Sequence, residues 1–150
     1  MALTDDRARL RGELTAVVVD LWFEIDHSDG TAASSFFTPD AELRFFTRSF
    51  HGTDEINAVY AGRHDRGPRV SRHLVTNLHV TASTADTASA VSNLLLYADD
   101  GEPPRPTVTP SLVADVVDDF ERHGDRWLIR RRHIRQLFAP PDAAFAVPTE

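Results

Sequence analysis

One alternating stretch, residues 71–80, places several side chains that can do chemistry on one side of a predicted strand. His73, Val75, Asn77 and His79 fall on that side, and the opposite side is mainly apolar. A neutral imidazole can take up a proton and return it, and an amide can bind an oxygen atom. Buried polar groups need partners or water, so we interpret the strand as the wall of a cavity. A solvent-facing edge with incidental histidines is the alternative.

The chain contains seven histidines, which raises the question of a metal site. His73 and His79 are six residues apart on the predicted strand, too far to share one ion comfortably. The other histidines lie in predicted loops or polar surroundings. The sequence has no cysteine, which excludes disulfides, thiol nucleophiles and thiolate metal ligands. We therefore expect no metal.

Periodicity predicts the elements before this strand. Residues 4–26 have apolar side chains at steps of three and four, which indicates an amphipathic helix. A short second helix is predicted at residues 31–37 and a strand at 41–46. A third helix opens at Gly52, with acidic residues in its first turn.

After the His73 strand, alternation predicts further strands at residues 89–97, 112–121 and 127–138. Helices followed by a run of strands indicate an α+β fold: a curved antiparallel sheet forming a cone closed by three N-terminal helices. The interior of such a cone can hold one small ligand. We expect a single domain over residues 1–150, with a core at about 4–138. Residues 139–150 form a tail that wraps the surface or frays.

Composition narrows the classes of partner. The 150 residues suit one domain, and the net charge of -7 argues against binding nucleic acid or an anionic membrane surface. The N-terminus does not resemble a signal peptide, and no apolar run is long enough to span a bilayer. We expect a cytoplasmic protein.

Several short motifs, in order, resemble SnoaL-like domains. Residues 23–29 and 36–41 are similar to the start of such a domain, and residues 52–56 to its next helix. Residues 72–77 resemble both SnoaL-like enzymes and the small subunit of ring-hydroxylating dioxygenases, and residues 127–132 resemble the final strand of both. The resemblance implies the nuclear transport factor 2-like, or cystatin-like, cone shared by scytalone dehydratase, steroid isomerases, polyketide cyclases and a bile-acid dehydratase.

For this chain the resemblance implies a catalytic pair, Asp26 at the end of the first helix and His73 on the first long strand. The chemistry is sound: a neutral imidazole can abstract a proton beside a carbonyl and deliver it to a leaving hydroxyl. A buried carboxylate fixes its tautomer and stabilises the imidazolium. Alternatively Asp26 faces water or ties down the loop after it. His73 would then be a structural histidine, as the dioxygenase small subunit implies.

The sequence departs from the dehydratase-like pattern in two ways. A tyrosine that polarises the substrate carbonyl often lies about one turn before the aspartate, where this chain has Leu21 and Trp22. Asn77, Asn93 or an arginine of the last strand would have to bind the oxygen instead. His27, directly after Asp26, is a second imidazole of unknown direction. We expect the arginines of residues 130–133 to pair with aspartates of the neighbouring strand rather than to form an anion site.

These observations favour a cofactor-independent lyase or isomerase (a dehydratase, double-bond isomerase or cyclase) acting on a small hydrophobic carbonyl compound, such as a polyketide, steroid or aromatic intermediate. The candidate substrate-binding residues are Trp22, Phe45, Val75, Asn77 and Asn93. A non-catalytic small-subunit-like or ligand-binding module is the alternative. An apolar outer face with Leu74, Leu78 and Val80 predicts a homodimer or homotrimer joined through the sheet.

Overall fold

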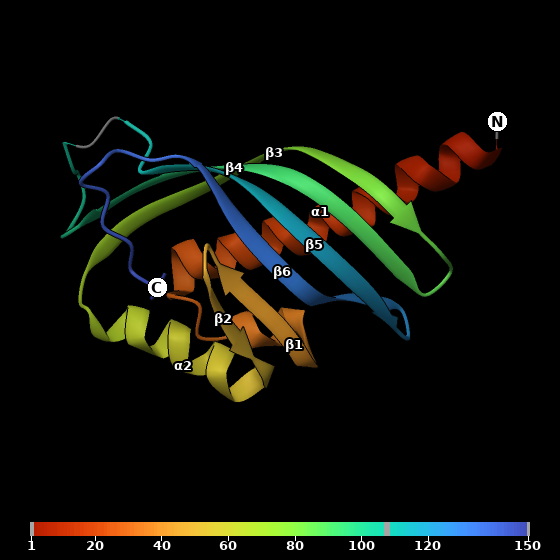
Figure 1. The fold of residues 1–150 in the computed structure, drawn as a ribbon, viewed down its shortest axis with the longest axis horizontal. Coiled ribbons are helices and arrows are strands. Elements are labelled where there is room, and N and C mark those ends of the chain that lie inside the picture. Colours follow the sequence, from red (N-terminus) through yellow and green to blue (C-terminus); the bar gives the residue numbers. More distant parts are fainter. Residues whose placement is uncertain (1, 107–108, 150) are drawn as a thin grey trace.

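A curved six-stranded sheet forms one layer of the molecule, and a long helix runs along it (Figure 1). The computed structural model describes residues 2–106 and 109–149, with side chains from residue 5 onward. The helices are α1 (Ala2–Ser28), the 3-10 turn η1 (Ala33–Phe36) and α2 (Gly52–Asp65). The strands are β1 (Phe37–Phe45), β2 (Arg48–His51), β3 (Arg69–Ser83), β4 (Thr87–Asp100), β5 (Leu112–His123) and β6 (Arg126–Phe138).

The strand order is β2-β1-β6-β5-β4-β3, so the chain leaves β2 at one edge of the sheet and enters β3 at the opposite edge. Strands β3 to β6 form an antiparallel meander, as predicted. Strand β1, however, pairs with β6 in parallel, so the sheet is mixed rather than antiparallel. Alternation shows which face a side chain takes but carries no information on strand direction, which is why the sequence did not indicate this pairing.

Helix α1 packs one face against the sheet. Its buried residues Leu14, Val18, Leu21 and Ile25 recur at steps of three and four and are at most 2% exposed. Phe23 on the opposite side is 61% exposed. The amphipathic pattern therefore predicted both the helix and its buried face.

Of the three predicted helices, the second is wrong: the described residues contain two α-helices. Residues 33–36 form only the single turn η1, and β1 begins at Phe37, earlier than expected. Pro39 disfavours helical geometry at the residue before it, which ends the turn and starts an extended segment. The short strand β2 was not predicted, because four residues give too little alternation to recognise.

A bulge in β3 changes which side chains face the core. Thr76 pairs with Asn93 and His79 with Val91, so β3 has one more residue than β4 between these pairs. Asn77 has φ 57°, a left-handed conformation that asparagine tolerates better than most residues. Before the bulge Ser71 and His73 face inward, whereas after it Leu78 and Val80 pack on the core. The predicted common face of His73, Asn77 and His79 is therefore wrong beyond Val75.

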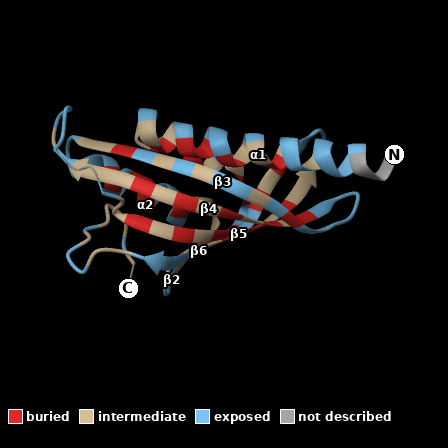
Figure 2. Ribbon diagram, turned by 90° about the horizontal axis from the view of Figure 1, so that it is seen from above, coloured by how far each residue is buried: buried red, intermediate tan, exposed pale blue. Residues whose placement is uncertain are grey.

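Burial alternates along the strands, and the core lies between the sheet and the helices (Figure 2). Within residues 130–133, Arg131 pairs with Asp119 and Arg132 with Asp118 on β5, as predicted, whereas Arg130 pairs with Glu121. Asp115 pairs with Arg135, which lies outside the predicted run. Among the described residues, none of the helices is both long and apolar enough to cross a membrane.

Candidate active site

The side chains of Asp26 and His73 meet where the end of α1 crosses the start of β3. His73 Nδ1 lies 2.6 Å from Asp26 Oδ1, and the backbone N–H of His73 donates to Asp26 Oδ2 at 2.8 Å. Ser71 Oγ donates a third hydrogen bond to Asp26 Oδ1, at 2.8 Å. The two side chains are only 6% and 10% exposed. Asp26 therefore neither faces water nor ties down the following loop.

The backbone explains why these groups meet. Asp26 is in the last turn of α1, one residue after the buried Ile25. Ser71 and His73 are two residues apart on β3, so both face the helix. The carboxylate thus receives side-chain hydrogen bonds from two inward positions and one from the backbone, which fixes its orientation.

Trp22 holds the His73 ring from the helix side. The two rings are stacked with centroids 4.2 Å apart and an interplanar angle of 6°. Trp22 lies one turn before Asp26, so one helix face supplies both the carboxylate and the stacking surface. The same indole contacts the guanidinium of Arg132, whose Cζ is 4.9 Å from the ring centroid. His73 can therefore neither rotate nor tilt without disturbing buried neighbours.

Both pKa values of the pair are lowered. Burial alone would raise the pKa of Asp26, but the hydrogen bonds and charge of His73 and the hydrogen bond from Ser71 bring it below 3.8. Burial lowers the pKa of His73 below 6.5; Asp26 opposes this shift, and the charges of Arg63 and Arg132 reinforce it. At neutral pH the pair is thus a carboxylate and a neutral imidazole. Because the carboxylate can only accept, Nδ1 carries the proton and Nε2 is the basic nitrogen.

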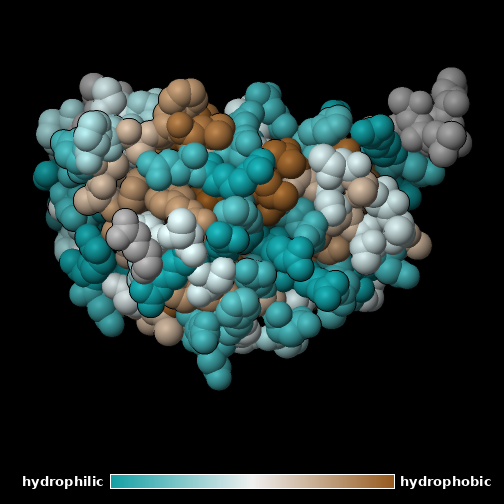
Figure 3. Space-filling model, in the orientation of Figure 1, coloured by the Kyte–Doolittle hydropathy of each residue, from teal (hydrophilic) through white to brown (hydrophobic). Residues whose placement is uncertain are grey.

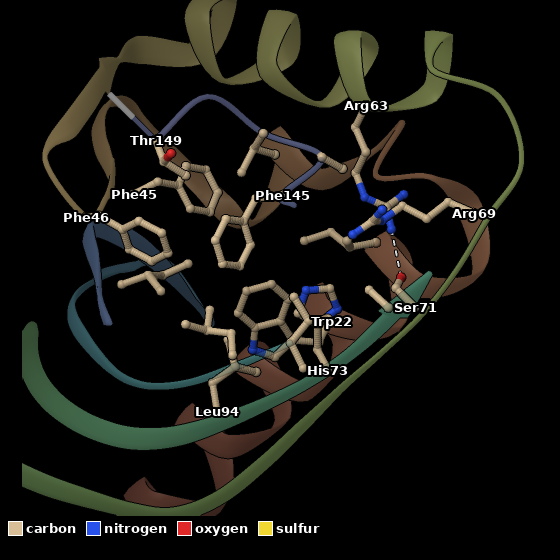
Figure 4. A pocket seen from close by; sticks show the side chains of 17 residues that line it. Trp22, Phe45, Phe46, Arg63, Arg69, Ser71, His73, Leu94, Phe145 and Thr149 are labelled. Carbon is tan, nitrogen blue, oxygen red and sulfur yellow. Dashed lines mark hydrogen bonds between the residues drawn. The ribbon is translucent and has the colours of Figure 1, made fainter. Parts of the chain in front are cut away.

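His73 lines a partly open cavity of about 50 Å³ (Figure 4). Its walls come from α1, α2, β1, the inner faces of the meander and the C-terminal segment. The apolar lining consists mainly of aromatic and branched side chains, among them Trp22, Ile25, Phe45, Phe46, Leu94, Leu96, Leu112, Ile134, Phe145 and Val147. The polar lining is Arg63, Arg69, Ser71, His73 and Thr149. An imidazole thus faces a small, largely apolar space.

The candidate substrate-binding residues divide into two groups. Trp22 and Phe45 line the cavity, and Val75 packs against the core beside it. Asn77 and Asn93 do not line the cavity. They lie on the outer face of the sheet, where Asn77 donates to Asn93 at 3.2 Å and Asn93 donates to Asp115 at 3.0 Å. The bulge at Asn77 and the alternation of β4 turn both amides outward, so neither can bind a ligand in this cavity.

Three features of the cavity were not predicted. Arg63 and Arg69 were not among the predicted site residues; Arg63 is in the last turn of α2 and Arg69 begins β3. The tail was expected to wrap the surface or fray, yet residues 145–149 close one side of the cavity. The apolar Phe145-Ala146-Val147 sequence was the only signal of this in the tail.

Hydrogen bonds from the side chains of an arginine and a threonine to backbone carbonyls of the tail hold it in place. Arg66 donates to the carbonyl of Phe145 at 3.4 Å, and Thr47 Oγ1 donates to the carbonyl of Thr149 at 3.0 Å. The ring of Phe145 packs edge-on against Phe46, with centroids 5.2 Å apart. The tail is therefore part of the cavity wall.

Within the described residues no group of histidine and acidic side chains has the arrangement of a metal site. His79 is exposed beyond the bulge, away from His73. His27 is also outside the cavity and stacks on the exposed ring of Phe23, with centroids 4.1 Å apart. Among the described residues, His73 is the one histidine that lines the cavity, and its partner is a carboxylate.

An α+β fold with a curved open sheet, and a carboxylate–imidazole pair on the wall of an internal cavity, define the class of this protein. The chain belongs to the SnoaL-like domain family, which matches residues 6–133. No curated protein matches the sequence.

Solved structures share this fold at low sequence identity. A Novosphingobium aromaticivorans protein provisionally described as a scytalone dehydratase is 16% identical, with a TM-score of 0.80, over 96% of this chain and 95% of that chain. ActVI-ORFA from Streptomyces coelicolor is 22% identical, with a TM-score of 0.72, over 85% and 96%. A Nostoc punctiforme protein of unknown function with a cystatin-like fold is 20% identical, with a TM-score of 0.71, over 86% and 92%.

Proposed function

We propose that the protein is a cofactor-independent lyase or isomerase that acts on a small hydrophobic carbonyl compound, with Asp26 and His73 as its acid–base pair. The observation that carries this proposal is the 2.6 Å contact between His73 Nδ1 and Asp26 Oδ1 on the wall of an apolar cavity. Membership of the SnoaL-like family supports it.

In this mechanism Nε2 of His73 takes a proton from the carbon beside the substrate carbonyl, and the electron pair of that C–H bond moves to give an enolate. Asp26 stabilises the imidazolium without taking its proton. The imidazolium then returns the proton. Delivery to a β-hydroxyl expels water, and delivery to a different carbon shifts the double bond. An enolate that attacks a second carbonyl closes a ring.

The shared first step can be tested without knowing the substrate. In D₂O the full chain should exchange the α-protons of small cyclic ketones for deuterium faster than buffer alone does. The exchange is followed by proton NMR. In His73→Ala the exchange rate should fall by about 10²–10⁴-fold, the typical effect of losing a general base. His79→Ala, which removes an exposed imidazole from the same strand, is the matched control and should keep the wild-type rate. Equal exchange in wild type and His73→Ala contradicts the proposal.

The small cavity favours a second candidate, a non-catalytic module like the dioxygenase small subunit. The cavity of about 50 Å³ is well below the ~300–1,000 Å³ of common ligand sites. In such a module the pair only stabilises the fold. His73→Ala would leave a buried carboxylate without its partner and cost on the order of 3–5 kcal/mol of folding free energy. A strongly destabilised variant, from a wild type that exchanges no ketone, supports this candidate.

We also propose that the protein is a homodimer or homotrimer joined through the outer face of the sheet. Leu74, Leu95, Val113 and Phe138 are register partners in turn across β3 to β6, and Leu74 and Phe138 are 50% and 71% exposed. Apolar patches alternate with polar ones on the face shown in Figure 3. Leu78 and Val80, predicted as part of this face, instead pack on the core. A monomer in light scattering at high micromolar concentration would refute the proposal.

A further inference from the structure

Two arginines project into the cavity beside His73. Arg63 comes from α2 and Arg69 from the start of β3, and their side chains are only 5% and 7% exposed. Figure 4 shows both guanidinium groups on the same side of the cavity as Ser71 and the His73 ring. The charge of Arg69 contributes to lowering the pKa of Arg63, after burial and against the opposing charge of Asp29, as expected for neighbouring cations. Two like charges thus lie together in a largely apolar enclosure.

The carboxylates that balance these cations lie toward solvent. Arg63 Nη1 is 3.2 Å from Asp29 Oδ1, and Arg69 Nη1 is 2.6 Å from Asp100 Oδ1. Asp29 and Asp100 are 47% and 61% exposed, whereas both arginines are nearly buried. The buried carboxylate of Asp26 is a further counter-charge of Arg63, on the cavity side. The carboxylate paired with Arg69 is on its outer side, so Arg69 is the arginine that presents positive charge to the cavity.

The two arginines have different further contacts. Arg63 Nη2 donates to Ser71 Oγ at 2.7 Å, and Ser71 in turn donates to Asp26, so Arg63 belongs to the network that orients the catalytic pair. Beyond its pair with Asp100, Arg69 has one further contact among the described residues, a long one of 3.5 Å from Nη2 to the carbonyl oxygen of Ala144. A guanidinium has five N–H groups. Arg69 is therefore the better placed of the two to bind a ligand, and Arg63 is a positioning residue.

We infer that Arg69, supported by Arg63, binds the substrate oxygen that becomes negatively charged when His73 removes the neighbouring proton. This inference rests on the proposed function and specifies its substrate: a compound with a carbonyl oxygen beside the acidic carbon. The carbonyl oxygen and the α-proton of such a substrate are three bonds apart, so the base and the hydrogen-bond donor must lie on adjacent walls of the cavity. Donors fixed in a water-poor site stabilise developing oxyanions strongly. The two arginines would replace the tyrosine phenol of the dehydratase-like pattern, which Leu21 and Trp22 cannot provide.

The subsite can be tested by ligand binding, independently of turnover. The probe is 4-nitrophenol, whose absorbance reports whether it is ionised, compared with the neutral isostere 4-nitrotoluene. Binding is measured on the full chain and on Phe145→Ala, which vacates ring-sized space in the cavity. We expect the phenolate to bind at least about tenfold more tightly than the isostere, the usual effect of one charged hydrogen bond, and the pKa of the bound phenol to fall.

Two variants assign the effect to Arg69. Arg69→Met should abolish the preference for the phenolate, whereas Arg130→Met, which removes a 59% exposed arginine of β6, should not. If Arg69→Met does not fold, Asp100→Asn still tests the inference, because loss of the counter-charge should strengthen phenolate binding. No preference for the phenolate in either background, or a preference unchanged in Arg69→Met, overturns the inference.

Failure of the inference and failure of the proposed function give different results. His73→Ala should keep the phenolate preference, because the base is not an oxygen ligand. Ketone exchange without phenolate preference overturns only the arginine subsite. Phenolate preference without any ketone exchange upholds the subsite as a binding site and rejects the lyase or isomerase.

Discussion

Two buried pairs, each joining a carboxylate to a nitrogen-containing side chain, contact the ring of Trp22, and they differ in what surrounds them. Asp118 and Arg132 bind each other through two hydrogen bonds of 2.7 and 2.8 Å, and their side chains are 2% and 0% exposed. Asp26 and His73 are joined by one side-chain contact at the cavity wall. The first pair is enclosed on all sides by the core. The second can gain or lose a proton and borders a space that a ligand could enter.

This difference separates a structural from a functional arrangement of charge. The pair of Arg132 with Asp118 does not line the cavity beside His73, so it holds β5 to β6 and supports Trp22. His73 stacks on that same indole. The enclosed pair therefore stabilises the stacking surface on which the imidazole of the titratable pair lies.

The largest effect on stability is expected from breaking the enclosed pair. Asp118→Ala leaves Arg132 buried without a counter-charge, at about 3–5 kcal/mol of unfolding free energy. For a chain of this size that lowers the melting temperature by on the order of 10 °C. Asp115→Ala on the same strand breaks a pair with a 51% exposed arginine and should cost about 1 kcal/mol or less. Equal losses, measured by thermal unfolding, would show that the enclosed pair is not structural.

At the titratable pair we expect a larger effect on the exchange rate than on stability. Asp26→Asn keeps one acceptor oxygen, for Ser71 or for the backbone N–H of His73, and leaves no buried charge without a partner, so stability should change less than in Asp118→Ala. The amide can favour the wrong imidazole tautomer and cannot balance an imidazolium, so ketone exchange should fall by about 10²-fold or more. Asp20→Asn, at an exposed position on α1, is the control. A large stability loss with an unchanged rate would place Asp26 with the structural pair.

A smaller effect is expected from opening the cavity. Phe145→Ala removes a half-buried ring that contacts Phe46 and should cost about 1 kcal/mol or less. It should also increase binding of benzene-sized ligands, measured by ligand-observed NMR. Phe23→Ala, which removes a 61% exposed ring, should leave binding unchanged. If Phe145→Ala does not improve binding, the tail does not limit the cavity.

The smallest effect is on the pH dependence of stability. The pKa of His73 is lowered in the folded state, so below about pH 6.5 the unfolded chain binds more protons and stability falls as the pH falls. Asp26, whose folded pKa is below 3.8, contributes stability that is lost only at still lower pH. Urea unfolding between pH 5 and 7 should show a shallower slope in His73→Ala than in wild type. A steeper slope in the variant would mean that the fold raises the pKa of His73.

The sequence predicted the parts of the molecule that depend on local periodicity. Helix α1 and the meander β3 to β6 follow from apolar spacing, and the resemblance to SnoaL-like domains identified Asp26 and His73 as a pair. The structure brings these two side chains together, while their catalytic role stays a prediction. Alternation could not reveal the bulge at Asn77, which depends on one residue adopting positive φ.

Other parts of the site depend on long-range contacts. Arg63 and Arg69 look like ordinary polar residues of a loop, and only the crossing of α2 and β3 buries them. The tail is held beside the cavity by hydrogen bonds to its backbone carbonyls, which any sequence provides. Sequence patterns indicate faces and elements but do not indicate which distant segments meet.

The most direct test of the account is the protonation state of His73, because the account requires a neutral imidazole with its proton on Nδ1. Nitrogen-15 NMR of the imidazole rings, titrated with pH and assigned with His73→Ala, reports both the tautomer and the pKa. We predict the Nδ1–H tautomer at neutral pH and a midpoint below 6.5. An Nε2–H tautomer, or a midpoint above neutral pH that leaves the imidazole protonated, would contradict the assignment of His73 as the base.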